Sequence, residues 1–274
     1  MKKENQMPTL SAASRKPIKG LVLADSGLGK TGMLWSLATA GFQLKLYDAD
    51  ANHGVLASAL KDHPEAMANV QVNEFRDKLK LNDKGFADGV PKAWTGFLKA
   101  LDKWPDGGGM NEWGPDVVAV FDTMTSLGKA ALSQAQYIEN KMGRLPEIQH
   151  YHTAMVQIEA LLGNIISDHV KCHVLILTHI NYTSNELGAM FGLPMAIGDK
   201  LSPKIPIYFN TMVALKRTGK KTILTTQPTA MVQTKVENFN QVQKEYELIA
   251  DGVGKPGLAE FFADCGWPGT ETPE

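Results

Sequence analysis

The sequence is poor in cysteine, and no long run of apolar residues occurs in it. Its two cysteines, Cys172 and Cys265, stand far apart among 274 residues, which argues against a disulfide framework and against a cysteine-rich zinc site. A membrane span needs about 18 or more consecutive apolar residues, and a signal peptide needs an apolar segment near the N-terminus. Neither pattern is present, so we expect a cytoplasmic protein with no membrane partner.

A net charge of either sign is also lacking. The chain has 28 Lys and Arg residues against 29 Asp and Glu residues, a formal net charge of -1, which argues against a uniformly basic nucleic-acid binder. The balance is a cancellation, because residues 200–235 contain basic residues and no acidic one, whereas acidic residues predominate in 236–274. These basic residues fit either a solvated hairpin with edge lysines or contacts with phosphate, from DNA or from a neighbouring subunit's nucleotide. They are Lys200, Lys204, Lys216, Arg217, Lys220, Lys221 and Lys235.

Apolar runs alternate with segments of helical periodicity along the chain. Runs at residues 18–24, 42–47, 117–121 and 174–179 predict strands, and unbroken apolarity is typical of strands buried on both faces of a sheet. Helical spacing occurs at 33–38, 54–61, 90–103 and 148–165, and β-like segments at 211–216, 221–226 and 231–236 predict antiparallel hairpins. We therefore predict an α/β fold with a mostly parallel central sheet flanked by helices. Residues 1–17 are polar and basic and are predicted to form a flexible tail.

Residues 24–31 match the phosphate-binding Walker A pattern G-x-x-x-x-G-K-[ST], with Ala24 in place of the first glycine. The segment lies between an expected strand and an expected helix, so its backbone N–H groups would surround a phosphate at the helix N-terminus. Lys30 is expected to contact the β- and γ-phosphates of ATP, and Thr31 to take one position of a bound Mg²⁺. The expected phosphate-binding residues are Ser26, Gly27, Leu28, Gly29, Lys30, Thr31 and Gly32. A chance glycine turn is the alternative.

Polar residues end the other expected strands. Asp122 closes the most apolar strand and is expected to hold Mg²⁺, partly through water; its alternative role is a helix N-cap. Asp50 is the expected catalytic base, with Asp48 as its competitor, because open α/β sheets bind ligands at the carboxyl ends of their strands. A solvated turn would explain these aspartates equally. His179 ends a further strand and would face the γ-phosphate, unless its role is structural.

The order of these motifs is similar to that of RecA-like P-loop ATPases, in particular the small phage-encoded AAA-domain ATPases implicated in single-strand annealing and recombination. The resemblance covers residues 18–240 as an ATPase core and leaves an acidic C-terminal segment over 241–274. It implies that Asp50, within Asp48-Ala49-Asp50, replaces a glutamate that activates water, so that the water lies closer or hydrolysis is slow. It also implies that Asp122-Thr123 is the Walker B pair and that His179 is the polar switch residue.

The same resemblance implies a homo-oligomer, either a ring or a filament, in which basic residues of the neighbouring subunit complete the ATP site. Lys216, Arg217 and Lys235 are the candidates, and spacing does not choose among them. A mobile DNA-binding loop is implied over residues 181–206, where Tyr182 and Phe191 could stack on bases or belong to the core. The implied partners are single-stranded DNA and a single-strand-binding or replication protein, in the host cytoplasm if the protein is phage-encoded.

We therefore expect a Mg²⁺-dependent ATPase that couples ATP binding and hydrolysis to single-stranded DNA binding in recombination, annealing or replication. A P-loop ATPase that acts on protein partners, in assembly or partitioning, is the first alternative. A nucleotide-gated binding module with slow hydrolysis is the second, because the Asp50 side chain is one methylene shorter than glutamate. A nucleotide kinase is disfavoured because the arginines available for a lid are few and dispersed: Arg15, Arg76, Arg144 and Arg217.

Overall fold

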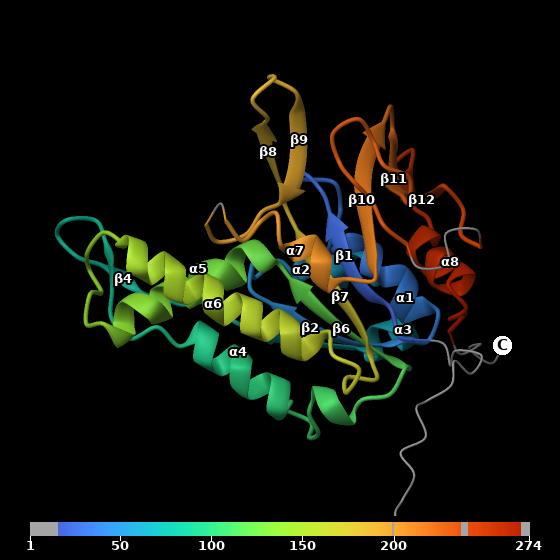
Figure 1. The fold of residues 1–274 in the computed structure, drawn as a ribbon. Helices are drawn as coiled ribbons and strands as arrows, with labels where there is room; N and C mark the ends of the chain where they lie inside the picture. The colour runs from blue at the N-terminus through green and yellow to red at the C-terminus, as the bar shows by residue number, and fades with distance from the viewer. Residues whose placement is uncertain (1–15, 199, 237–240, 270–274) are drawn as a thin grey trace, which may run out of the picture.

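A nine-stranded sheet forms the centre of the molecule (Figure 1). The computed structural model describes residues 16–198, 200–236 and 241–269, and the strand order is β13-β12-β11-β10-β1-β7-β6-β2-β3. The strands are β1 (Lys19–Leu23), β2 (Gln43–Asp48), β3 (Val70–Glu74), β6 (Val117–Asp122), β7 (His173–Thr178), β10 (Thr211–Thr218), β11 (Lys221–Thr225), β12 (Glu245–Ala250) and β13 (Val253–Gly254). Pairing is parallel from β10 to β3 and antiparallel from β10 to β13. The predicted α/β fold, with a mostly parallel sheet and antiparallel C-terminal strands, is confirmed.

Helices cover both faces of this sheet (Figure 1). Helices α4, α5 and α6 share one hydrophobic core with the sheet, and α1, α2, α3 and α8 share a second core on the opposite face. The helices are α1 (Trp35–Thr39), α2 (Gly54–Ala59), α3 (Pro64–Ala68), α4 (Ala93–Asp102), α5 (Met124–Ile138), α6 (Ile148–Ile165), α7 (Ile205–Tyr208) and α8 (Gly257–Asp264), with 3₁₀ turns η1 (Gly32–Leu34) and η2 (Met110–Glu112). Within the described ranges, no helix has both the length and the apolarity to cross a bilayer.

The central strands are buried on both faces, as their unbroken apolar runs predict. Strand β6 shows the reason: Val117, Ala119 and Phe121 pack with α4, α5 and α6, while Val118 and Val120 pack with the helices of the other face. Because successive side chains of a strand point to opposite faces, a strand between two helical layers needs apolar residues at every position.

Aromatic packing fixes the ends of β2 and β6, where the predicted site residues begin. The rings of Tyr47 and Phe121 stack with centroids 4.7 Å apart, and Phe97 of α4 meets both rings edge-on. Tyr47 and Phe121 each directly precede an aspartate of the sheet edge, Asp48 and Asp122. Truncation of such a ring to alanine costs about 3–5 kcal/mol, so this packing holds the two carboxylates in place.

The prediction of a strand at residues 231–236 is wrong. This segment makes only two isolated bridges, Gly192 with Val232 and Met212 with Lys235. Strand β12 takes the place beside β11, and α8 packs on the same sheet. Residues 241–269 therefore contribute to the same sheet and core as the residues before 237. The predicted tail at 1–17 lies outside the described residues, except for Lys16 and Pro17.

Part of the segment 181–206, over which the resemblance implies a mobile DNA-binding loop, has regular secondary structure. Strands β8 (Ile180–Ser184) and β9 (Met190–Pro194) form an antiparallel hairpin, which projects from the sheet edge beside β10 and β11 (Figure 1). Residues of β8 after Ile180 alternate between partly buried and exposed positions, and residues of β9 after Met190 alternate between partly buried and buried ones. Gly188 and Gly192 obscure this alternation in the sequence. Strand β3 was missed because it lies at the edge of the sheet and mixes polar with apolar residues.

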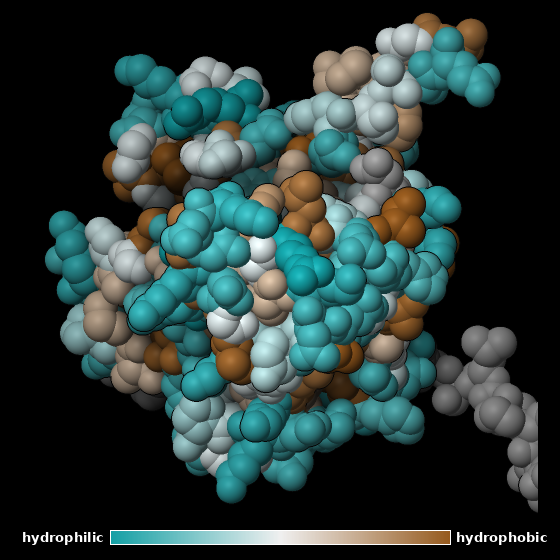
Figure 2. All heavy atoms as spheres, turned by 90° about the vertical axis from the view of Figure 1, so that its left-hand side faces the viewer, coloured by the Kyte–Doolittle hydropathy of each residue, from teal (hydrophilic) through white to brown (hydrophobic). Residues whose placement is uncertain are grey.

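One end of the molecule is formed by β4 (Lys80–Leu81), β5 (Ala87–Asp88) and the connection from α5 to α6. The face at this end is mainly hydrophilic, and its apolar residues are scattered (Figure 2). In this view they form no continuous apolar patch.

Candidate nucleotide site at the carboxyl edge of the sheet

Four neighbouring parallel strands bring the predicted site residues together. Strands β1, β7, β6 and β2 are adjacent and point the same way. The P-loop at residues 24–31 follows β1, His179 follows β7, Asp122 ends β6, and Asp48 ends β2. Asp48 and Asp122 are partners in the register of β2 and β6. The parallel topology thus collects these side chains at one edge, where α/β sheets bind ligands.

The P-loop has the backbone that phosphate binding requires. Gly27 and Gly29 adopt φ angles of 77° and 78°, which side-chain-bearing residues rarely adopt. Ala24, which replaces the first glycine of the pattern, is fully buried, and its N–H donates to the carbonyl of Thr178 at 3.1 Å. Its conformation is not one that demands glycine, so the departure from the pattern leaves the loop intact.

Lys30 is buried with its ammonium group bonded to neutral acceptors. Its Nζ donates to the carbonyl oxygens of Ala24 at 3.2 Å and Asp25 at 3.0 Å, and lies 3.2 Å from Nδ1 of His179. Burial lowers the pKa of Lys30, and the nearby carboxylates of Asp122 and Asp50 oppose that shift. Burial, together with Lys30, also lowers the pKa of His179, which favours the neutral ring that can accept this hydrogen bond. No described carboxylate is close enough to form an ion pair with Lys30.

Thr31 and Asp122 form the second element of the site. The Thr31 hydroxyl donates to Oδ2 of Asp122 in a very short contact. Burial raises the pKa of Asp122 to about 6, with Asp50 and Asp48 adding to the rise, while the bond from Thr31 opposes it. The N-cap of α5 is Thr123, whose Oγ1 accepts from the N–H of Ser126, so the N-cap role is not the one that Asp122 plays.

The oxygen atoms of Thr31 and Asp122 fit a Mg²⁺ ion that is shared with a nucleotide. Mg²⁺ prefers oxygen ligands and is commonly held by one or two protein groups together with phosphates and water. The described residues contain no group of three or more His, Cys, Asp or Glu side chains that could hold a metal without such help. Thr31 and Asp122 would therefore hold the ion only when phosphate is bound.

Asp48 and Asp50, the two candidates for the catalytic base in the sequence, have different environments in the structure. Asp48 is fully buried and accepts hydrogen bonds from the backbone N–H groups of Asp50, Asn52 and His53 and contacts Nδ1 of His53 at 2.7 Å. Asp50 is partly exposed, and the Thr123 hydroxyl donates to its Oδ1 at 3.3 Å. Asp48 therefore shapes the loop, whereas Asp50 keeps lone pairs free to meet a water molecule.

A hollow of about 680 Å³ adjoins the P-loop at Gly29 and Gly32. We call it the Trp35 hollow, because Trp35 lines it, with its ring stacked on that of His63 at 5.8 Å between centroids. Ile249, on β12, also lines it. Sequence reasoning missed these residues; the only signal was the position of Trp35 in the helix that leaves the P-loop.

The hairpin β8–β9 is linked to the P-loop at two points, through the residue that directly precedes it and through its own Tyr182. One is the contact between Lys30 and His179, the residue that separates β7 from β8. The other is the Tyr182 hydroxyl, which donates to Oδ2 of Asp25 at 3.1 Å. A further hollow of about 460 Å³, which we call the hairpin hollow, is lined by Asp25, Tyr182 and Arg217 among others. A change in the P-loop can thus reach this hairpin directly.

The basic segment at residues 200–235 is partly neutralised. Lys204 pairs with Glu159 at 2.9 Å, and Lys216 and Lys221 pair with Glu245 and Glu247 of β12. Of the predicted trans-acting residues, Arg217 and Lys235 are exposed and make no ion pair with a described residue. Only Lys216 and Arg217 lie near the P-loop, in the hairpin hollow. Neither Tyr182 nor Phe191 belongs to the buried core.

Comparison with known proteins shows likeness in structure only. No protein-family model matches the sequence, and no curated protein matches it. A prototypical ATPase from the type III secretion system of pathogenic bacteria is 12% identical with a TM-score of 0.45, over 74% of this chain and 53% of that one. An ATP synthase subunit, NeqB of Nanoarcheaum equitans, is 11% identical with a TM-score of 0.37, over 74% of this chain and 46% of that one. The matched part of this chain spans about half the length of those structures.

The raised pKa of Asp122 predicts how the stability of the protein depends on pH. Its pKa lies above the usual 3.8, near 6, so its contribution to folding stability is present below pH 3.8 and is lost as the pH rises through about 6. We expect Asp122→Asn to raise the free energy of unfolding of the ligand-free protein at neutral pH, by up to about 3 kcal/mol. Urea unfolding at acidic and at neutral pH measures this. The gain should shrink at acidic pH, and a destabilised Asn variant at neutral pH would contradict the assignment.

Proposed function

We propose that this protein is a Mg²⁺-dependent ATPase that binds ATP at the P-loop and hydrolyses it with the help of Asp50. The observation that supports this best is the convergence of Lys30, Thr31, Asp122 and Asp50 at one sheet edge, where a buried cation without a carboxylate partner lies beside an acidic pair. An anionic, metal-bound ligand would satisfy both, because phosphate matches the ammonium group and Mg²⁺ matches the carboxylate oxygen atoms.

The roles of the residues follow from their positions. Lys30 exchanges its bonds to Ala24, Asp25 and His179 for bonds to the phosphates. Thr31 and Asp122 are the residues that would hold Mg²⁺, and a bound Mg²⁺ would supply positive charge to the transferred phosphoryl group. Asp50 accepts a proton from the attacking water. The Trp35 hollow, which starts at the P-loop glycines, receives the adenine base.

Replacement of Lys30 tests the phosphate site. We expect Lys30→Ala to lower the rate of ATP hydrolysis by about 100-fold or more, the usual cost of removing one group that stabilises developing charge. Steady-state phosphate release measures it. Lys99→Ala, an exposed lysine of α4, is the matched control and should hydrolyse ATP at the wild-type rate. Normal turnover by a folded Lys30→Ala protein would contradict the assignment.

The two aspartates of the loop after β2 should respond differently. We expect Asp50→Asn to lower kcat by about 100-fold or more while nucleotide affinity changes little, since Asp50 acts on water. Asp48→Asn should instead lower the free energy of unfolding by about 2 kcal/mol, because Asp48 accepts several hydrogen bonds as a buried charge. Single-turnover kinetics and thermal unfolding distinguish the two. A stable Asp48→Asn protein whose kcat falls more than that of Asp50→Asn would reverse the roles.

Binding of single-stranded DNA is the output of this ATPase in our proposal, in the phage type of recombination, annealing or replication. The hairpin β8–β9 supports it, because it contacts the P-loop through Tyr182 and through His179, which directly precedes it. The hairpin also borders the hairpin hollow, which Arg217 lines as well. An exposed tyrosine and an arginine are suited to stacking with bases and contact with phosphate. The proposal includes a homo-oligomer, a ring or a filament, with Arg217 or another basic residue acting on the neighbour's nucleotide, and a single-strand-binding or replication protein as a further partner.

Removal of two exposed cations tests the DNA proposal. We expect Arg217→Gln/Lys220→Gln to weaken binding of oligo(dT) and to flatten the slope of log affinity against log salt by about 1.4, the value for two lost single-strand phosphate contacts. Fluorescence anisotropy in a salt titration measures both, beside ATPase assays with and without oligo(dT). A wild-type protein with no salt-dependent binding and no stimulation by DNA would favour protein partners instead.

Slow hydrolysis is a second candidate property that one observation favours. Asp50 stands where the resembled family has glutamate, and its carboxylate is tied to Thr123 at 3.3 Å. The protein would then act as a nucleotide-gated binding module whose hairpin responds to ATP binding more than to turnover.

A further inference from the structure

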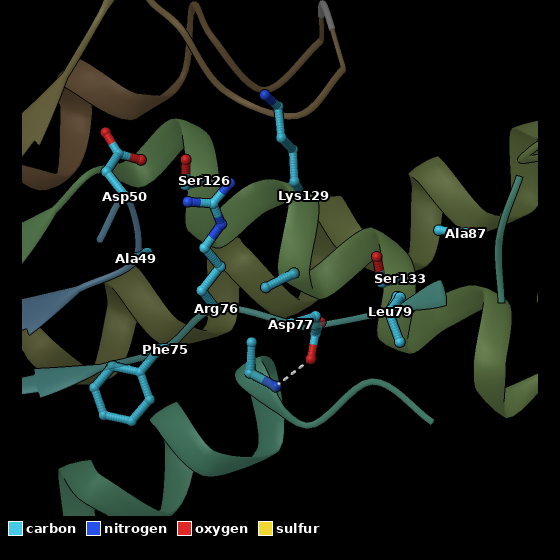
Figure 3. Close-up of a pocket in the computed structure, with 12 residues that line it drawn as sticks. Ala49, Asp50, Phe75, Arg76, Asp77, Leu79, Ala87, Ser126, Lys129 and Ser133 are labelled. Carbon is cyan, nitrogen blue, oxygen red and sulfur yellow. Dashed lines mark hydrogen bonds between the residues drawn. The ribbon is translucent and has the colours of Figure 1, made fainter. Parts of the chain in front are cut away.

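A separate hollow of about 450 Å³ opens beside Asp50. It contains no P-loop residue, and we call it the Asp50 hollow. Its walls are the segment after β3, the start of β5, the start of α4 and residues 126–133 of α5, and Asp50 lies at its edge (Figure 3). The volume lies within the range of small-molecule sites, about 300–1,000 Å³. It has room for one nucleotide unit.

Two cations line this hollow without ion-pair partners. Arg76 and Lys129 are both exposed, and neither forms an ion pair with a described residue. Figure 3 shows the Arg76 side chain extending from the segment after β3 toward Ser126 and Asp50. Asp77 also lines the hollow, and its carboxylate is bonded to the backbone. Its Oδ1 accepts hydrogen bonds from the N–H groups of Lys92 at 2.6 Å and Ala93 at 2.8 Å, at the start of α4.

Helix α5 presents a polar stripe to the same hollow. Ser126, Lys129 and Ser133 are three and four residues apart, so they share one face of the helix. Both serine side chains are partly exposed. Hydroxyl groups beside an arginine and a lysine are the donors that proteins use for phosphate. The donor set therefore favours an oxyanion.

The remaining walls of the hollow are apolar. Phe75, Leu79, Ala93 and Ala130 line it, and Phe75 is nearly buried, with its ring stacked on Tyr47 at 5.8 Å between centroids. A ligand with both a charged and a flat apolar part matches such a surface better than a bare anion does.

We infer that the Asp50 hollow binds the phosphate of a nucleotide unit, with Arg76 and Lys129 as its charged contacts and Ser126 and Ser133 as hydroxyl donors. The unit comes from a single strand of DNA, or from a free mononucleotide with the same chemistry. This inference rests on the proposed function, because it gives the strand a contact beside the residue that activates water.

The test compares two double variants that remove the same charge. Arg76→Gln/Lys129→Gln alters the hollow, and Lys99→Gln/Lys103→Gln alters exposed lysines at the end of α4. Anisotropy of labelled oligo(dT), without ATP, at about 50 and about 200 mM salt, should show at least tenfold weaker binding at the lower salt for the first variant and a salt slope flatter by about 1.4. The control should lose less than about twofold, since exposed charges far from a ligand are screened.

A further variant and a second ligand complete the test. Ser133→Glu places a negative charge in the hollow and should weaken binding as well, which covers a double variant that fails to fold. Calorimetric titration with dTMP shows whether the nucleotide unit comes from a DNA strand or from a free mononucleotide. If the hollow variants lose dTMP binding and retain oligo(dT) binding, the hollow is assigned to free mononucleotides.

Unchanged binding of both ligands in the folded hollow variants would overturn the inference, and so would a wild-type protein that binds neither. Sensitivity to Arg217→Gln/Lys220→Gln alone would overturn it too and leave the proposed DNA function standing. The ATPase proposal fails separately, through normal turnover by Lys30→Ala.

Discussion

The candidate site depends on the burial of the Lys30 ammonium group and on the hydrogen bonds that this group makes. Moving an isolated charge out of water costs several kcal/mol, and among the described residues two carbonyl oxygens and the His179 ring replace the water around Lys30. The carboxylates of Asp122, Asp50 and Asp25 surround it at longer range and favour its charged form. The P-loop is therefore held in a conformation that a phosphate would complete. Asp122 is the acidic group of the site that corresponds to the basic Lys30. It accepts a hydrogen bond from Thr31, and its burial raises its pKa.

The contact between Lys30 and His179 connects the candidate nucleotide site to the rest of the fold. His179 stands between β7 and β8, so a ligand that withdraws Lys30 from His179 changes the base of the hairpin β8–β9. The hydrogen bond between Tyr182 and Asp25 gives the hairpin a second tie to the P-loop. On the other side of the site, the stacked rings of Tyr47 and Phe121 keep β2 and β6 rigid. In the proposed function, we therefore expect nucleotide binding to move the hairpin more than the loop that carries Asp50.

The parts of the fold that sequence predicts are those that local patterns determine. The unbroken apolar runs of β1, β6 and β7 predict strands that are buried between two layers of helices. The spacing of Gly29, Lys30 and Thr31 predicts the P-loop. Partners distant in sequence were not predictable: β12 takes the place expected for 231–236, and its Glu245 and Glu247 neutralise Lys216 and Lys221. The choice between Asp48 and Asp50 depends on backbone N–H groups that only the folded turn directs at Asp48. The Trp35 and Asp50 hollows arise between elements with no common motif.

The most direct measurement is a structure of the protein with Mg²⁺ and a non-hydrolysable ATP analogue. We expect the Lys30 ammonium group on phosphate oxygen atoms, away from His179, with Thr31 and Asp122 turned toward the metal and the base in the Trp35 hollow. An analogue bound elsewhere, with Lys30 still bonded to Ala24, Asp25 and His179, would contradict the assignment of this edge as the nucleotide site.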